Sequence, residues 1–127
     1  MDTLTELINY VVTKNNFAGE DSDVFRYILP DEPLDAIVII PYGGSSTPIF
    51  NDYSSKNFQI NVRRKSRSQA FAIAEAIKKS LRSIDSAYIS LESMECPIEL
   101  LDSPFFVGTS QKNTIVVAFN ISITSMN

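Results

Sequence analysis

The sequence predicts an α+β fold in which a mixed, mostly antiparallel β-sheet carries two helices on one face. Residues 3–14 and 67–83 repeat apolar side chains at helical spacing, whereas 58–64 and 114–124 alternate apolar and polar side chains as half-buried strands do. With the shorter apolar runs, the order of elements is α-β-β-β-α-β-β-β, which favours strands and helices in separate layers. At this length the chain fits a single domain, residues 1–127.

The first half of the chain contains one helix and three strands. Asp2 or Thr3 can cap the first helix. Its apolar stripe consists of Leu4, Leu7, Ile8, Val11 and Val12. A short strand is predicted over 24–29, where Pro30 ends it, and a buried strand over the β-branched run 36–42.

Residues 43–57, GGSSTPIFNDYSSKN, are predicted to form a long polar loop that is mobile in the free chain. This segment lacks the spacing of a phosphate-binding loop, and no helix follows to hold a phosphate. We expect the loop to become ordered on contact with a partner. The candidate residues are Gly43, Gly44, Ser45, Ser46, Asn51 and Asp52.

The second half begins with the strongest helix signal. Ser66 and Gln69 have the spacing of a capping box, and one apolar stripe runs from Ala70 to Ile84. A strand is predicted over 88–94, with Pro97 breaking it. Two more strands, 103–109 and 114–124, are predicted to form a hairpin around the polar residues between them.

The composition argues against an enzyme. The chain has no histidine and a single cysteine, Cys96, which excludes Ser-His-Asp and Cys-His catalysis within one copy. We therefore expect no catalytic residue, no cofactor and no metal site. The acidic segment PDEPLD, residues 30–35, lacks the spacing of an EF-hand and is better explained as a solvated turn.

The chain carries no sign of export or membrane insertion. The N-terminal stretch MDTLTELINY lacks the basic region and cleavage site of a signal peptide. The longest apolar run, residues 36–40, is far shorter than the ~20 residues that cross a bilayer. We expect a chain made in a cytoplasm that does not bind a membrane.

Charge is distributed unevenly. Residues 1–62 contain three basic and nine acidic side chains, 63–82 seven basic and one acidic, and 83–127 one basic and five acidic. The net charge of the whole chain is −4. A nucleic-acid-binding domain is usually basic as a whole, so a basic element within an acidic chain favours docking between copies or partners.

The basic turn before the second helix is the main candidate site. It consists of Arg63, Arg64, Lys65 and Arg67. Because these residues lie at the positive end of the helix dipole, the dipole does not explain them. They fit a solvated cluster, an inter-subunit or partner contact, or nucleic-acid recognition, but aromatic side chains are not interleaved with them as stacking on bases requires. The acidic groups that could meet them on a neighbour are Asp31, Glu32 and Asp35.

The strand FQINVRRKS, residues 58–66, followed by the capped amphipathic helix, resembles the phage minor capsid protein family, whose small members are related in fold to siphophage tail terminators. PDEPLDAIVI (30–39) and LDSPFFVGTSQKNTIVVAFNISI (101–123) fit the same pattern. The resemblance covers nearly the whole chain and rests on the pattern of elements, since none of these segments is diagnostic by itself.

The resemblance implies a virion structural protein of the head–tail junction. Tail terminators form a hexameric ring on the finished tail tube and present the surface that docks to the head. DNA passes through the lumen without sequence-specific contacts. The implied partners are further copies of the chain, the tail tube protein and a head–tail connector protein, after synthesis in the bacterial host cytoplasm. Two other classes remain open: another connector or head-completion protein, and a small ligand-binding domain or enzyme subunit.

Overall fold

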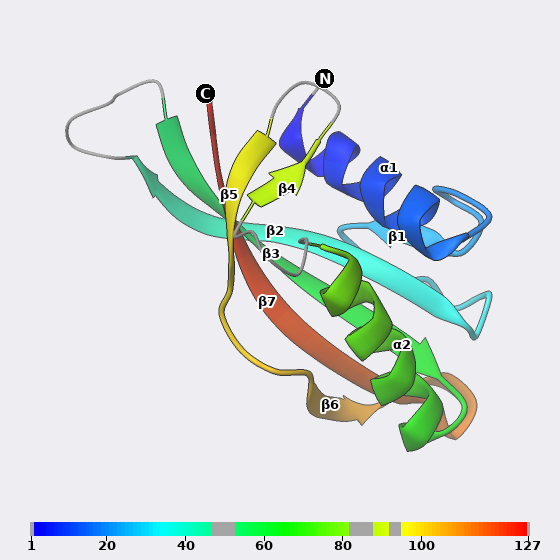
Figure 1. The fold of residues 1–127 in the computed structure, drawn as a ribbon. Coiled ribbons are helices and arrows are strands. Elements are labelled where there is room, and N and C mark those ends of the chain that lie inside the picture. The colour runs from blue at the N-terminus through cyan, green and yellow to red at the C-terminus, as the bar shows by residue number, and fades with distance from the viewer. Residues whose placement is uncertain (1, 47–52, 82–87, 92–94, 127) are drawn as a thin grey trace.

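The computed structural model describes residues 2–46, 53–81, 88–91 and 95–126. In these ranges two α-helices and seven strands follow one another along the chain (Figure 1). The elements are α1 (Thr3–Asn15), β1 (Val24–Arg26), β2 (Ala36–Ser46), β3 (Tyr53–Arg64), α2 (Arg67–Ser80), β4 (Tyr88–Ser90), β5 (Glu95–Leu100), β6 (Phe105–Thr109), the short 3-10 helix η1 (Gln111–Asn113) and β7 (Ile115–Met126).

The strands form one mixed sheet in the order β1-β2-β3-β7-β5-β4. β1 is parallel to β2, and the other pairs are antiparallel. β6 lies outside this order and pairs with the first half of β7, whereas β5 pairs with the second half. The predicted α+β class with a mostly antiparallel sheet is therefore confirmed.

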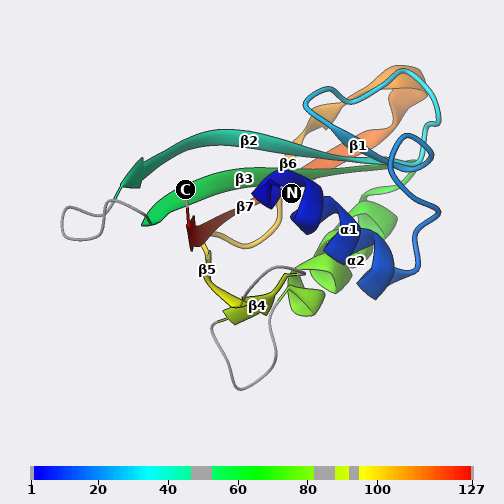
Figure 2. The same cartoon turned by 90° about the horizontal axis from the view of Figure 1, so that it is seen from above.

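Both helices cover the same face of the sheet, which curls around them (Figures 1 and 2). The hydrophobic core lies between these two layers. From the helices it takes Leu7, Ile8, Val11, Ala70, Ala74 and Ile77, and from the long strands Ile37, Ile39, Phe58, Ile60, Val62, Val117, Phe119 and Ile121. Burial of these side chains supplies most of the driving force for packing helices onto sheet. Neither described helix is long and apolar enough to cross a membrane.

Helix α1 begins where Asp2 caps it. The Thr5 backbone N–H donates to Asp2 Oδ1 at 2.7 Å, which satisfies one of the amides that a helix start leaves free. This hydrogen bond is the main reason that the pKa of Asp2 is lowered below its usual value. The helix ends at Asn16, whose backbone is left-handed at φ 57°.

Helix α2 begins at the predicted cap, since the Gln69 backbone N–H donates to Ser66 Oγ at 3.3 Å. Its last residue, Ser80, is tied to α1 by two hydrogen bonds. Tyr10 Oη donates to the Ser80 carbonyl oxygen at 2.6 Å, and Asn15 Nδ2 donates to Ser80 Oγ at 3.1 Å. Burial raises the pKa of the Tyr10 hydroxyl. These contacts hold the two helices side by side on the sheet.

The first predicted strand is shorter than expected. The prediction ran over 24–29, whereas β1 ends at Arg26. Tyr27 has a positive φ of 72°, and the Ile28 backbone N–H donates to the Arg26 carbonyl oxygen at 2.9 Å. This tight three-residue turn, rather than Pro30, ends the strand.

The predicted loop 43–57 is wrong for most of its length. β2 continues to Ser46 and β3 begins at Tyr53, so the two strands form an extended hairpin. The register shifts between Tyr42 and Gly44, and Gly43 takes a left-handed φ of 54° at this bulge. Composition misled the prediction, because polar residues are compatible with strands that extend beyond the core.

The strand predicted over 88–94 is replaced by two short ones, β4 and β5, the second of which contains Pro97. The pairing of β5 with β7 begins only at Ile98. The missing N–H of Pro97 therefore breaks no bond of that ladder. The two hairpin strands around η1 were predicted correctly, within the usual uncertainty of their ends.

Candidate subunit interface

The residues of the basic turn do not share one environment. β3 directs Val62 into the hydrophobic core, so the next residue, Arg63, points to the opposite face of the sheet. That side chain is nevertheless only 1% exposed. The segment between β1 and β2 passes over it.

Arg63 is held almost entirely by backbone carbonyl oxygens. Its Nε donates to Leu34 O at 2.8 Å, and Nη2 donates to Pro30 O at 2.6 Å and to Pro33 O at 2.7 Å. A longer contact of 3.4 Å joins Nη2 to Asp31 O, and Nη1 donates to Ser110 Oγ at 3.3 Å. The guanidinium thus fixes the 30–34 segment and the start of the β6–β7 connection to β3.

This geometry corrects the prediction for Arg63. A buried side chain whose donors are already bound inside the chain is not available to a neighbouring copy. The sequence could not reveal this, because alternation along β3 places Arg63 with Gln59 and Asn61 on a face that reads as solvent-facing. Only the long-range return of residues 30–34 over that face buries the guanidinium.

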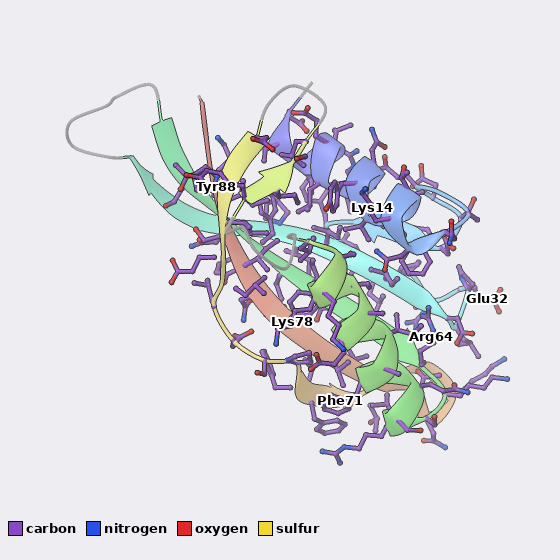
Figure 3. All side chains as sticks on the ribbon, in the orientation of Figure 1. Lys14, Glu32, Arg64, Phe71, Lys78 and Tyr88 are labelled. Carbon is purple, nitrogen blue, oxygen red and sulfur yellow. The ribbon has the colours of Figure 1, made fainter. Side chains whose placement is uncertain are left out.

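The acidic residues predicted as its counterpart are at the surface. Asp31, Glu32 and Asp35 are all exposed, on the segment that Arg63 holds by its carbonyls. Figure 3 places Glu32 and Arg64 at the same end of the molecule, with Tyr88 at the other. The structure therefore brings the acidic and basic turns near each other within one chain.

Arg64 is partly buried. Its Nη1 donates to the Arg63 carbonyl oxygen at 2.8 Å. Burial lowers the pKa of Arg64, and the charges of Asp35 and Asp23 oppose this effect. Part of the Arg64 charge is therefore compensated within the chain. Arg64 is less available to a partner than its neighbour Lys65, which is exposed.

Arg67 is exposed and lies against aromatic rings. The centre of its guanidinium is 4.9 Å from the ring centroid of Phe106 and 5.8 Å from that of Phe71. Such cation–π contacts stabilise by roughly 0.5–1 kcal/mol at exposed sites. Sequence reasoning missed Phe106, since 39 residues separate it from Arg67. Aromatic rings do accompany the basic turn, but they reach it through the fold.

β6 exposes an apolar surface beside this arginine. Phe105, Phe106 and Val107 are all exposed, although each is a large apolar side chain. Among the described strands, β6 pairs with β7 alone, so its other edge is open. The consecutive apolar residues of SPFFV (103–107) could have indicated an apolar surface here. The sequence could not show that this strand lies at an edge of the sheet.

The residues predicted as a mobile loop fall in two groups. Gly43, Gly44, Ser45 and Ser46 belong to β2, whereas Asn51 and Asp52 lie outside the described residues. The first group lies in the half of the hairpin that extends away from the helices (Figure 1).

Other chemistry is not evident in the described part of the chain. No group of three or more acidic or cysteine side chains there could hold a metal ion. Cys96 is buried in the core, and burial first of all raises the pKa of its thiol. Burial and a raised pKa both make this thiol a poor nucleophile. On the outer face of β7, Asp102 accepts from the backbone N–H and from Nδ2 of Asn120, both at 2.7 Å, which is a structural contact.

Comparison with known protein families identifies the class to which this fold belongs. Residues 11–125 match the family described as bacteriophage tail terminator protein. The chain belongs to this family. It is a structural, non-enzymatic component of the phage tail, and membership implies association with the tail tube. No curated protein matches the sequence.

Proposed function

We propose that copies of this chain assemble as a hexameric ring that caps the tail tube and joins it to a head–tail connector protein. The observation that carries the proposal is the pair of exposed charged surfaces of opposite sign. Lys65 and Arg67 lie on one, and Asp31, Glu32 and Asp35 on the other. A ring requires two different surfaces on each copy, because every contact joins one surface to the other.

The ring leaves a lumen for the passage of DNA. The net charge of −4 is unfavourable for tight binding of phosphates, which suits DNA that must slide through. We propose that no base is read. The partly buried Arg64 and the exposed Lys65 and Arg67 therefore contact protein, with Arg63 holding the acidic turn in place.

The same proposal includes the end of the β2–β3 hairpin. Gly43, Gly44, Ser45 and Ser46 of β2, with Asn51 and Asp52, contact the tube or the connector. Hydrogen exchange of the chain alone and on purified tubes tests this point. Unchanged exchange of the Gly43–Ser46 amides on tubes would count against it.

The experiment for the main proposal combines native mass and tube binding. We expect purified tail tubes mixed with the chain to acquire a cap at one end, with six copies per tube, and to stop growing. Native mass measured over a rising concentration series, at low and moderate salt, then shows whether the ring forms without a tube. Tubes that grow normally in the presence of excess chain would refute the proposed function.

A further inference from the structure

Two exposed surfaces combine apolar side chains with charge of opposite sign. The basic patch consists of Lys65, Arg67, Phe105, Phe106 and Val107. The acidic patch consists of Tyr27, Ile28, Asp31 and Glu32. Each is continuous in structure, the first through the Arg67–Phe106 contact and the second along the chain.

The acidic patch is built to present its apolar residues. The turn at Tyr27 directs the chain away from β2, and Ile28 is 75% exposed, more than any other large apolar side chain among those described. Directly after it, the carbonyl oxygens of Pro30 and Pro33 are held by Arg63. The segment is therefore fixed before any partner arrives, which reduces the conformational entropy lost on binding.

The basic patch is equally preorganised. β6 is held by its ladder to β7, and Arg67 lies in the first turn of α2 over the ring of Phe106. Aromatic and arginine side chains are the residue types that contribute most to protein–protein binding. An open edge with three exposed apolar residues is costly to leave in water and invites a partner.

The apolar parts of the two patches are separated in each chain, although the acidic turn and the start of the basic turn share one end of the molecule (Figure 3). β2, β3 and β7 separate β1 from β6 in the sheet. In Figure 3, Phe71, whose ring Arg67 also contacts, lies at the lower end of α2, apart from Glu32. The apolar side chains of the two patches can therefore face two different neighbours of one copy.

From these observations we infer that the acidic patch of one copy binds the basic patch of the next copy. Apolar side chains meet apolar side chains, and Asp31 and Glu32 face Lys65 and Arg67. Binding of the basic patch to itself would instead bring two Arg67 side chains together, which like-charge repulsion disfavours. The contact is head to tail, so it can propagate and close. The inference rests on the proposed function, for which it identifies the two contacting surfaces.

The test uses two single variants, Ile28→Asp and Phe106→Asp, each of which inserts a carboxylate into one patch. Native mass is measured for the wild-type chain up to about 1 mM. We expect wild-type copies to associate and each variant to associate at least tenfold more weakly, as for a central apolar contact. Thermal unfolding of both variants verifies that they fold.

An equimolar mixture of the two variants gives the sharpest result. Ile28→Asp copies keep an intact basic patch and Phe106→Asp copies an intact acidic patch, so one good contact can form between them. We expect heterodimers in the mixture and no larger species. Tyr88→Asp is the matched control, because Tyr88 is exposed but lies at the other end of the molecule (Figure 3), and it should associate like wild type.

Three outcomes would overturn the inference: a wild-type chain that stays monomeric throughout, variants that associate like wild type, or a mixture that forms no heterodimer. None of these would remove the proposed function, because the tube could still template the ring through other surfaces. Failure of the wild-type chain to cap tail tubes would refute the proposed function instead, whatever the association of free copies.

Discussion

Arg63 and Arg67 are four residues apart in one basic turn, yet one side chain is buried and the other is exposed. Arg63 is buried and binds the carbonyl oxygens of Pro30, Pro33 and Leu34. Arg67 is exposed and lies over the Phe106 ring. The first arginine joins segments of one chain, whereas the second remains available to a partner. A cluster of like charges in a sequence thus need not be one site.

The comparison predicts its largest effect at Arg63. Arg63→Met keeps most of the side-chain volume but leaves the carbonyl oxygens of Pro30, Pro33 and Leu34 without their donor. We expect the free energy of unfolding to fall by about 3–5 kcal/mol. Urea denaturation followed by circular dichroism measures this loss. Lys65→Met, at an exposed neighbour, is the control and should change stability by less than about 0.5 kcal/mol. Equal effects of both variants would contradict the distinction between the two positions.

Charge reversal at Arg67 should have the opposite profile. Arg67→Glu loses an exposed cation–π contact, so we expect stability to fall by no more than about 1 kcal/mol. Association with further copies or with tail tubes should weaken at least tenfold, and its salt dependence should decrease. Sedimentation velocity at low and moderate salt measures both quantities. Unchanged association at both salt concentrations would show that the exposed arginine makes no partner contact.

The stability lost on removing the Asp2 cap measures what a single exposed hydrogen bond contributes, and the loss at Arg63 can be compared with it. Asp2→Ala removes the cap of α1 and should cost about 1 kcal/mol at neutral pH. Because the folded pKa of Asp2 is depressed, its contribution is present above the unfolded value of about 3.9 and is lost as pH falls through the folded pKa. The wild type and Asp2→Ala should therefore converge in acid. Asp2→Asn, which can still cap, should not show this pH dependence; a constant gap for Asp2→Ala would refute the assignment.

The smallest expected effect lies at the Glu20–Arg26 ion pair, which is a partly exposed counterpart to the buried Arg63 network. Glu20 accepts two hydrogen bonds from Arg26, and Arg26 Nη2 also donates to Thr5 Oγ1 at 3.2 Å. Solvent reaches both side chains and screens the pair, so Glu20→Gln should cost less than about 1 kcal/mol. Thermal unfolding at low and high salt measures it. A loss as large as that of Arg63→Met would mean that exposure does not distinguish these two arginines.

The sequence by itself determined the elements whose signals are local. The cap at Ser66, the cap of the first helix at Asp2 or Thr3, the apolar stripes of both helices and the alternation along β3 and β7 depend only on neighbouring residues. The structure contains these features, with Asp2 as the first cap, while Ile84 of the second stripe lies outside the described residues. The α+β class and the family pattern follow from their order. The division between acidic and basic segments was also available from the sequence.

Only the tertiary structure decided which charges face a partner. The return of residues 30–34 over β3 buries Arg63, and the pairing of β6 with β7 brings Phe106 under Arg67. Both depend on contacts between residues about 30 to 40 positions apart, which local periodicity does not encode. The physical reason is that burial and charge compensation are properties of the packed chain, whereas helix and strand signals arise from adjacent residues.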